Sequence, residues 1–223
     1  MDLELLRQVP LFANLTSDEC EALSDAMTVR KFPKDCMVIW ADDEGDSFFV
    51  IREGQVKVSV NAVDGREVIL SSLGSGEFFG DMSLLDGEPR SANVTTLTAT
   101  EALVLRRPDF LRAIRTHPSI AVHLMVSLAD RLRRADHQTA NLALLGIADR
   151  ICTVLLSIAE EEGRETPDGV VIPRRPTHQM LASMTGTARE TVTRVLKRLT
   201  DDGYIQSQGR KMVILRRDEI LDV

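Results

Sequence analysis

Hydrophobic and polar positions follow different periods in different parts of this chain. The first is helical: Thr16-Ser17-Asp18-Glu19 has the form of a capping box, in which Thr16 is the N-cap and Glu19 bonds back to it. The pattern predicts a helix that ends near Met27 and packs on the domain that follows.

Between residues 28 and 107 the texture is that of short strands. Runs rich in β-branched and aromatic residues are separated by glycines, and Asp64-Gly65 is typical of a hairpin turn because glycine adopts the positive φ that the turn needs. The runs span residues 37–40, 47–51, 55–60, 67–73, 92–98 and 101–105. Short strands with glycines between them predict an all-β sandwich or barrel.

Helical periodicity returns after residue 107. Pro108 is expected in the first turn of a helix that ends near residue 115, and His117-Pro118 breaks it. A long helix is predicted from residue 119 to about 145. Along it, one stripe recurs every four and three residues and is apolar or small except for Thr139: Ala121, Met125, Leu128, Leu132, Ala135, Thr139 and Leu142. This period favours a helix that pairs with a second copy of itself, although a lone helix on the β domain would also fit.

The remaining chain predicts a mixed domain. The long helix should end or bend at Gly146, and another helix should cover residues 148–161. Residues 163–167 are polar and turn-like, and residues 170–172 form a short strand closed by Pro173.

Residues 177–199, THQMLASMTGTARETVTRVLKRL, carry the strongest motif. A first helix is expected at 178–184, with small Ala182 where two helices cross. Gly186 follows in the turn, and Val192 packs the second helix back onto the first; this spacing is the signature of a helix-turn-helix. Thr187 or Ala188 begins the second helix, and Thr187 is the better N-cap.

The second helix has two unlike faces. Its buried side is predicted to be Val192, Val195, Leu196 and Leu199. Within about 140° of arc on the other side, at 100° per residue, lie Arg189, Glu190, Thr193, Arg194 and Lys197. Arg can bond guanine O6 and N7, and Glu can accept from cytosine N4. The alternative is an ordinary amphipathic surface helix with solvated charges.

Charge sharpens this picture. The chain carries a net charge of −7, which argues against a surface coated uniformly for nucleic acid. Residues 174–198 nevertheless hold six Lys or Arg and one acid, Glu190. Arg174, Arg175 and Lys197 suit phosphates. Gly209-Arg210-Lys211 would be the basic tip of a hairpin, which has the shape of a DNA-binding wing.

A second candidate site is the segment GSGEFFGDMSLLDGEPRS at residues 74–91. Glycines, a helix start near Asp81 and the pair Arg90-Ser91 would offer N–H groups, a hydroxyl and a guanidinium to a buried phosphate. Asp81 could accept from a sugar hydroxyl. The alternative is a glycine-rich loop with an exposed Arg.

Several classes are disfavoured. Cys20, Cys36 and Cys152 are an odd count, far apart, so a disulfide framework, a zinc site and an iron–sulfur cluster are not expected. No apolar run is long enough for a membrane helix, and the first residues lack the order of a signal peptide, so a cytoplasmic protein without a membrane partner is expected. No nucleophile–base pair or P-loop indicates an enzyme.

Three segments resemble the cyclic-AMP receptor protein / fumarate-nitrate regulator (Crp/Fnr) family of bacterial transcription factors. They are GEFFGDMSLLDGEPRSA at 76–92, NLALLGIADRI at 141–151 and GTARETVTRVLKRLTDDGYI at 186–205. The resemblance implies an α+β fold in three parts: a cyclic-nucleotide-binding β-roll (jelly roll) with flanking helices at 1–118, a dimerisation helix and hinge at 119–146, and a winged helix-turn-helix at 147–223.

The resemblance also implies site residues. In the β-roll, Gly80 and Asp81 would meet a ribose and Arg90 and Ser91 a cyclic phosphate. The full expected ligand set is Gly80, Asp81, Met82, Ser83, Arg90, Ser91, Ala135 and Asp136. The expected DNA set is Arg174, Arg175, Thr187, Ala188, Arg189, Glu190, Thr193, Arg194, Lys197, Arg210 and Lys211.

By the same resemblance, a homodimer would bind a palindrome with TGTGA-like half-sites and contact RNA polymerase. The first candidate for its effector is cAMP, and the second is cGMP. No metal or haem is expected. Three positions depart from the family: Asp81 replaces a usual Glu, Ala135-Asp136 replaces a Thr-Ser pair at the base, and Ala188 replaces a frequent Ser. Because the departures at Asp81 and Ala135 bear on the ligand, an orphan regulator without a small-molecule effector is the alternative.

Overall fold

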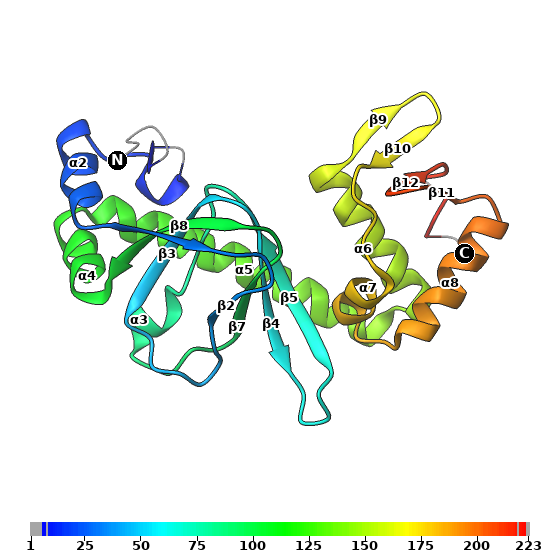
Figure 1. The fold of residues 1–223 in the computed structure, drawn as a ribbon, viewed down its shortest axis with the longest axis horizontal. Helices are drawn as coiled ribbons and strands as arrows, with labels where there is room; N and C mark the ends of the chain where they lie inside the picture. The colour runs from blue at the N-terminus through cyan, green and yellow to red at the C-terminus, as the bar shows by residue number, and fades with distance from the viewer. Residues whose placement is uncertain (1–5, 8, 218, 222–223) are drawn as a thin grey trace. The chain divides into compact units, whose positions relative to one another are not determined.

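The computed structural model describes residues 6–7, 9–217 and 219–221, and Figure 1 shows their fold. The chain divides into two compact units. The first comprises residues 1–62 and 69–133, and the second comprises residues 63–68 and 134–223.

The first unit opens with a short 3-10 helix, η1 (Pro10–Phe12), and α2 (Ser17–Asp25). The predicted capping box is present: the Glu19 N–H donates to Thr16 Oγ1, and the Thr16 N–H donates to the Glu19 carboxylate at 2.7 Å. The strands and helices that follow are β1 (Thr28–Phe32), β2 (Met37–Ile39), β3 (Ser47–Glu53), β4 (Val56–Asn61), β5 (Glu67–Leu73), β6 (Phe78–Phe79), α3 (Met82–Asp86), β7 (Asn93–Thr96), β8 (Thr100–Arg106) and α4 (Arg107–Thr116).

These strands form two antiparallel sheets, with the orders β1-β8-β3-β6 and β2-β7-β4-β5. Strand β3 explains how the layers stack, because successive side chains of a strand point to opposite faces. Phe48 and Val50 pack in a core with residues of α2, α4 and the following helix, whereas Phe49 and Ile51 pack in a second core between the sheets. The predicted β-roll is therefore confirmed, with helices covering the outer face of one sheet.

The sequence missed parts of this roll. Strands β1 and β6 were not among the expected runs. Four of the five residues of β1 are exposed, so it lacks the clear alternation of a half-buried strand, and β6 is only two residues long. β6 pairs with β3 at Phe49–Phe79, whose rings stack with their centroids 4.8 Å apart. Only the tertiary fold brings these two segments together.

The long helix α5 (Pro118–Leu144) and the next helix, α6 (Ile147–Glu162), lie within one residue of their predicted ranges. Ile120 and Leu124 of α5 are buried in the helix-side core of the first unit. The predicted break at Gly146 is also present, because Gly146 is the N-cap of α6 and its N–H donates to Asp149 at 3.1 Å. Across the described residues, no helix combines the length and apolar character that crossing a membrane requires.

The second unit packs α6, α7 (His178–Thr185) and α8 (Arg189–Asp201) against an antiparallel sheet of order β11-β12-β10-β9. Its strands are β9 (Arg164–Thr166), β10 (Gly169–Ile172), β11 (Ile205–Gln208) and β12 (Lys211–Ile214). The prediction of a turn at 163–167 is wrong, since β9 pairs with β10 there. All three residues of β9 are exposed, so this edge strand has no apolar alternation by which to find it.

Candidate functional site

Arg90 is the centre of the candidate pocket in the β-roll. Its side chain is buried, with 7% of the residue exposed. Nη1 donates to the Gly80 carbonyl and to Ser83 Oγ, both at 2.8 Å, and Nη2 donates to the Ser47 carbonyl at 2.8 Å. A buried guanidinium needs such acceptors, because an unpaired buried charge is very costly. The structure therefore excludes the alternative of a loop with an exposed Arg.

Two glycines make room for this guanidinium. A Cβ on Gly45 would lie 2.1 Å from Ser83 Oγ and 2.8 Å from Arg90 Nε, and a Cβ on Gly80 would lie 2.8 Å from Arg90 Nη1. Gly80 also has a φ of +81°, which strains any other residue. The backbone of both segments can approach Arg90 only because these positions lack a side chain.

The guanidinium keeps one edge available. Three of its five N–H groups bond to the acceptors above, which leaves Nε–H and one N–H of Nη2 without a partner among the described residues. Adjacent donors on Nε and Nη2 are the pair with which a guanidinium can hold a phosphate by two parallel bonds. Burial lowers the pKa of Arg90, while the charges of Asp46 and Asp81 partly offset this shift.

Asp81, the expected ribose contact, is almost fully buried and paired within the protein. Arg131 of α5 donates from Nη1 to both carboxylate oxygens, at 2.9 Å and 3.1 Å, and from Nη2 to the Phe78 carbonyl at 3.0 Å. Its guanidinium also lies over the Phe78 ring, 4.9 Å from the centroid. Asp81 is thus a connection between the pocket loop and the long helix.

The other expected ligand residues are placed less centrally. Met82 and Ser91 are exposed, and the Ser91 hydroxyl lies 3.7 Å from the Met82 sulfur. Ala135 and Asp136 are exposed on α5, in the part of the helix that belongs to the second unit. The structure therefore brings together Gly80, Asp81, Ser83 and Arg90.

Sequence reasoning missed Gly45, Ser47 and Arg131 as parts of this site. Gly45 carried a usable signal, since it is a lone glycine within the acidic run Asp42-Asp43-Glu44-Gly45-Asp46. Ser47 acts through its backbone carbonyl, which leaves no trace in side-chain chemistry. Arg131 lies on α5, 50 residues from Asp81, and periodicity does not report such a pairing.

The second candidate site is built on α7 and α8. Thr177 caps α7 by accepting from the Met180 N–H at 3.1 Å, and Gly186 ends it in the left-handed conformation, with a φ of +65°. Ala182 and Val192 are buried where the two helices meet. The predicted helix-turn-helix is confirmed in its helices and in the roles of these three residues.

The two faces of α8 are also as predicted. Val192, Leu196 and Leu199 are buried and Val195 packs partly buried against the same core. The exposed side holds the expected DNA-reading residues: Arg189, Glu190, Thr193, Arg194 and Lys197. We call this set the reading face.

Thr187 is not the N-cap of α8, contrary to expectation. The N-cap is Ala188, which has an extended backbone and no side-chain cap bond. The Thr187 N–H donates to the Ala182 carbonyl at 3.0 Å, so this residue closes the end of α7 instead. Because α7 extends to Thr185 and α8 begins at Arg189, the turn keeps three residues and lies one position later than expected.

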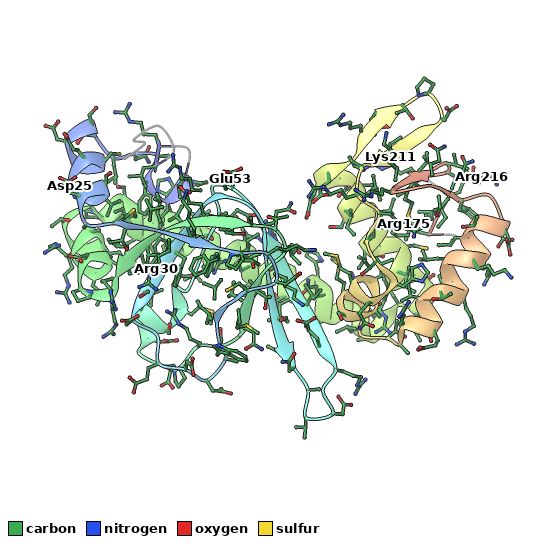
Figure 2. The ribbon with its side chains drawn as sticks, in the orientation of Figure 1. Asp25, Arg30, Glu53, Arg175, Lys211 and Arg216 are labelled. Carbon is green, nitrogen blue, oxygen red and sulfur yellow. The ribbon has the colours of Figure 1, made fainter. Side chains whose placement is uncertain are left out.

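Basic residues flank the reading face. Arg174, Arg175, Arg210 and Lys211 are all exposed. Arg175 lies beside the β11–β12 hairpin: its backbone N–H donates to the Arg210 carbonyl at 2.8 Å, and its side chain donates to Ser207 Oγ at 3.3 Å. Figure 2 labels Arg175 and Lys211, which both lie in the second unit.

The apolar stripe of α5 is largely open to solvent in the single chain. Met125, Leu132 and Leu142 are 61%, 63% and 56% exposed. Ala121 and Leu128 are half-buried, and Leu128 packs against the core of the first unit. Large apolar side chains repeated along an exposed helix face are typical of an interaction surface.

The cysteines form no metal site in the described part of the chain, where no group of three or more His, Cys, Asp or Glu is placed to hold a metal. Cys20 and Cys152 are buried and Cys36 is half-buried, all as free thiols. Burial, assisted by the charge of Asp149, raises the pKa of Cys152 to about 11. This thiol is therefore protonated and unreactive at neutral pH.

Two family models match the chain. A cyclic nucleotide-binding domain matches residues 29–117, which contain the Arg90 pocket. A Crp-like helix-turn-helix domain matches residues 149–223, which contain the reading face. The two matches fall on the two sites that the geometry singled out.

Relatives match over most of the chain. The cAMP-activated global transcriptional regulator CRP of Haemophilus influenzae is 35% identical over 188 residues, which cover 83% of this chain and 83% of the relative. The CRP-like cAMP-activated global transcriptional regulator of Mycobacterium tuberculosis is 29% identical and covers 95% and 94%. The solved structure of the c-di-GMP responsive global regulator CLP of Xanthomonas campestris superposes with a TM-score of 0.80 at 27% identity, covering 89% and 99%.

Proposed function

The chain belongs to the Crp/Fnr family of transcription regulators, and from this premise we propose that it is a homodimer whose binding to a TGTGA-like inverted repeat is gated by a cyclic nucleotide. We put cAMP first and cGMP second as the effector. Relatives in this family are transcriptional regulators rather than enzymes, and a DNA-binding helix-turn-helix is common to them.

The observation that carries the ligand half of the proposal is the unused edge of Arg90. A guanidinium that is buried, fixed by three bonds and left with a two-donor fork is prepared for an anion with paired oxygens. A phosphodiester within a nucleotide ring supplies such oxygens. We therefore assign the phosphate subsite to Arg90, Gly80 and Ser83, with Ser91 at its rim.

The Asp81–Arg131 pair supplies the route for gating. A ribose hydroxyl that bonds to Asp81 competes with Arg131, and Arg131 is anchored in α5. A ligand shifts an equilibrium only when it interacts differently with the two states. The two states here differ in whether Asp81 is held by α5 or by the nucleotide.

The exposed stripe of α5 supports the dimer. A parallel pairing would bury Met125, Leu132 and Leu142 against their copies at the period of a two-stranded coiled coil. We expect Leu132→Glu to convert the dimer to a monomer in sedimentation velocity, because it sets two carboxylates against each other in the seam. Arg133→Glu on the same helix, which lies outside the stripe and is also exposed, should leave the dimer intact.

The alternative is an orphan regulator that binds DNA without an effector. Two observations favour it: Asp81 is already satisfied by Arg131, and Ala135 has no polar group for a base. The relative that responds to c-di-GMP adds a third nucleotide to be tested.

Calorimetric titration with cAMP, cGMP and c-di-GMP separates these versions. The gated version predicts micromolar binding of one nucleotide, abolished by Arg90→Ala and retained by Arg30→Ala, an exposed arginine on β1. No heat with any of the three at millimolar concentration would favour the orphan version. Binding that Arg90→Ala leaves unchanged would overturn the assigned subsite.

A further inference from the structure

His178 joins the two helices of the helix-turn-helix in a way that the sequence analysis did not anticipate. It is the first residue of α7, and its Nδ1 lies 2.8 Å from Oγ1 of Thr193 on α8. Thr193 belongs to the reading face. The contact therefore connects a titratable ring to a residue expected to face DNA.

The direction of this bond follows from a second one. Thr193 Oγ1 also lies 3.0 Å from the Arg189 carbonyl, an atom that can only accept. A hydroxyl has one proton, and we assign it to the bond with that carbonyl, so that His178 Nδ1 donates to Oγ1. The neutral ring therefore carries its proton on Nδ1 and an unprotonated lone pair on Nε2.

Nε2 is the atom left for DNA. It has no hydrogen-bond partner among the described residues. It is also accessible to solvent, because Nε of Arg150 is the one side-chain N or O atom of the described residues that is both buried and without a partner. A phosphate presents only acceptors, so neutral Nε2 cannot bond to it. The protonated ring donates from Nε2 as well and adds a positive charge.

The charges around the ring fix the sign of the effect. Burial lowers the pKa of His178, and the cationic side chains of Arg175, before α7, and Arg189, on α8, lower it further. No charged group of α6, the other helix against α7, contributes among the described residues. DNA phosphates would counter both arginines and favour the imidazolium.

We propose that His178 is a proton-linked phosphate contact of the DNA-reading surface, held by Thr193 so that only the protonated ring donates from Nε2 to the DNA backbone. The inference rests on the proposed DNA binding and adds to it a regulation by pH. Because the pKa of His178 is higher in the complex than in the free protein, DNA binding takes up protons. The gain in affinity is full below the free pKa and absent above the bound pKa.

The direct test is a count of protons taken up by the full-length protein. Titration calorimetry of an inverted-repeat duplex, with cAMP present, is run near pH 6.5 in two buffers of different ionisation enthalpy. We expect net uptake in wild type that His178→Gln removes. His137→Gln is the matched control, since His137 is exposed and belongs to α5 rather than to the helix-turn-helix, and it should keep the uptake.

Salt and pH series give an independent reading. As the pH falls from about 8 to about 5.5, wild-type affinity should rise about threefold to tenfold per half-site. Its salt slope should steepen by about 0.9 per added phosphate contact. Thr193→Val removes the hydroxyl that orients the ring and should flatten both trends while leaving the melting temperature close to that of wild type.

The outcomes separate the two levels of the account. If wild type binds the inverted repeat and His178→Gln keeps the same proton uptake, the inference about His178 is wrong and the DNA-binding proposal stands. If no variant, wild type included, prefers the inverted repeat to random duplex at any pH, the proposed DNA binding itself is overturned.

Discussion

The Arg90 pocket and the reading face of α8 are both proposed to bind phosphate groups, yet they are built in opposite ways. Arg90 is 7% exposed, and most of its donors are already bonded to the protein. The residues of the reading face are exposed, and their polar groups bond mainly to their own helix, as Thr193 does to Arg189 and Arg194 to Thr191. The Arg90 side chain therefore contributes to the stability of the fold, whereas the side chains of the reading face lie on its surface.

This difference separates two kinds of electrostatics. A phosphate at the buried fork of Arg90 is attracted through a medium of low dielectric, where salt screens little. Phosphates at the reading face displace counterions, so that affinity falls steeply with salt. Nucleotide binding should therefore change little between low and moderate salt, while DNA binding changes strongly.

The largest effect is expected at Arg90. Arg90→Ala should weaken nucleotide binding by about 2–5 kcal/mol, as is usual when one partner of a buried charged pair is removed. It should also destabilise the first unit by about 1–3 kcal/mol, because the carbonyls of Gly80 and Ser47 lose their donor. Calorimetry and urea denaturation measure the two losses. An Arg90→Ala variant with the unfolding free energy of wild type would contradict the buried geometry.

Next in size is Arg189. Arg189→Ala should cost about 1–3 kcal/mol of binding to the inverted repeat and relax base preference at one half-site position, with no change in unfolding. Arg198→Ala on the same helix is the control, because Arg198 pairs with Asp202 and lies outside the reading face. Equal losses of DNA affinity in the two variants, measured by fluorescence anisotropy, would show that the reading face is wrongly assigned.

The turn between α7 and α8 comes third. Gly186→Ala should destabilise the second unit by about 1–2 kcal/mol, the cost of a Cβ in the left-handed region. No clash adds to this, since the nearest atom to the added Cβ is Leu142 Cδ2 at 3.8 Å. Gly74→Ala, which has no positive φ and only Glu77 Oε2 at 4.0 Å, should be neutral in the same thermal melts.

Arg174 is expected to have the smallest effect. It is exposed in the segment before α7 and offers only its charge. Arg174→Ala should weaken specific and random duplexes alike and lower the salt slope by about 0.9 per half-site, which a series of salt concentrations would measure. A loss confined to the inverted repeat would instead give Arg174 a part in base recognition.

The sequence predicted the reading face more completely than the Arg90 pocket. The reading face depends on a local period: Ala182, Gly186 and Val192 at fixed offsets determine the turn, and the polar residues follow on the other side of α8. Such relations lie within one segment. The error at Thr187 was one residue, and it arose because α7 continues to Thr185 and its end takes up the Thr187 N–H, which moves the turn one position along the chain.

The pocket was predicted only in outline. Gly80, Asp81 and Arg90 lie within one glycine-rich segment and were found, but the groups that complete the site come from elsewhere. The Ser47 carbonyl is 43 residues away and Arg131 is on another helix. A backbone acceptor and a distant ion pair have no periodic signature, so they become visible only when the sheets and α5 are packed.

In the proposed function, a nucleotide bound at Arg90 controls the affinity of the reading face for DNA. Fluorescence anisotropy of a labelled TGTGA inverted repeat, with half-sites about one helical turn apart, measures this with and without saturating cAMP. The account predicts at least about a tenfold gain in affinity for wild type, equal to about 1.4 kcal/mol, and none for Arg90→Ala. Equal affinity of wild-type protein with and without the nucleotide would contradict it.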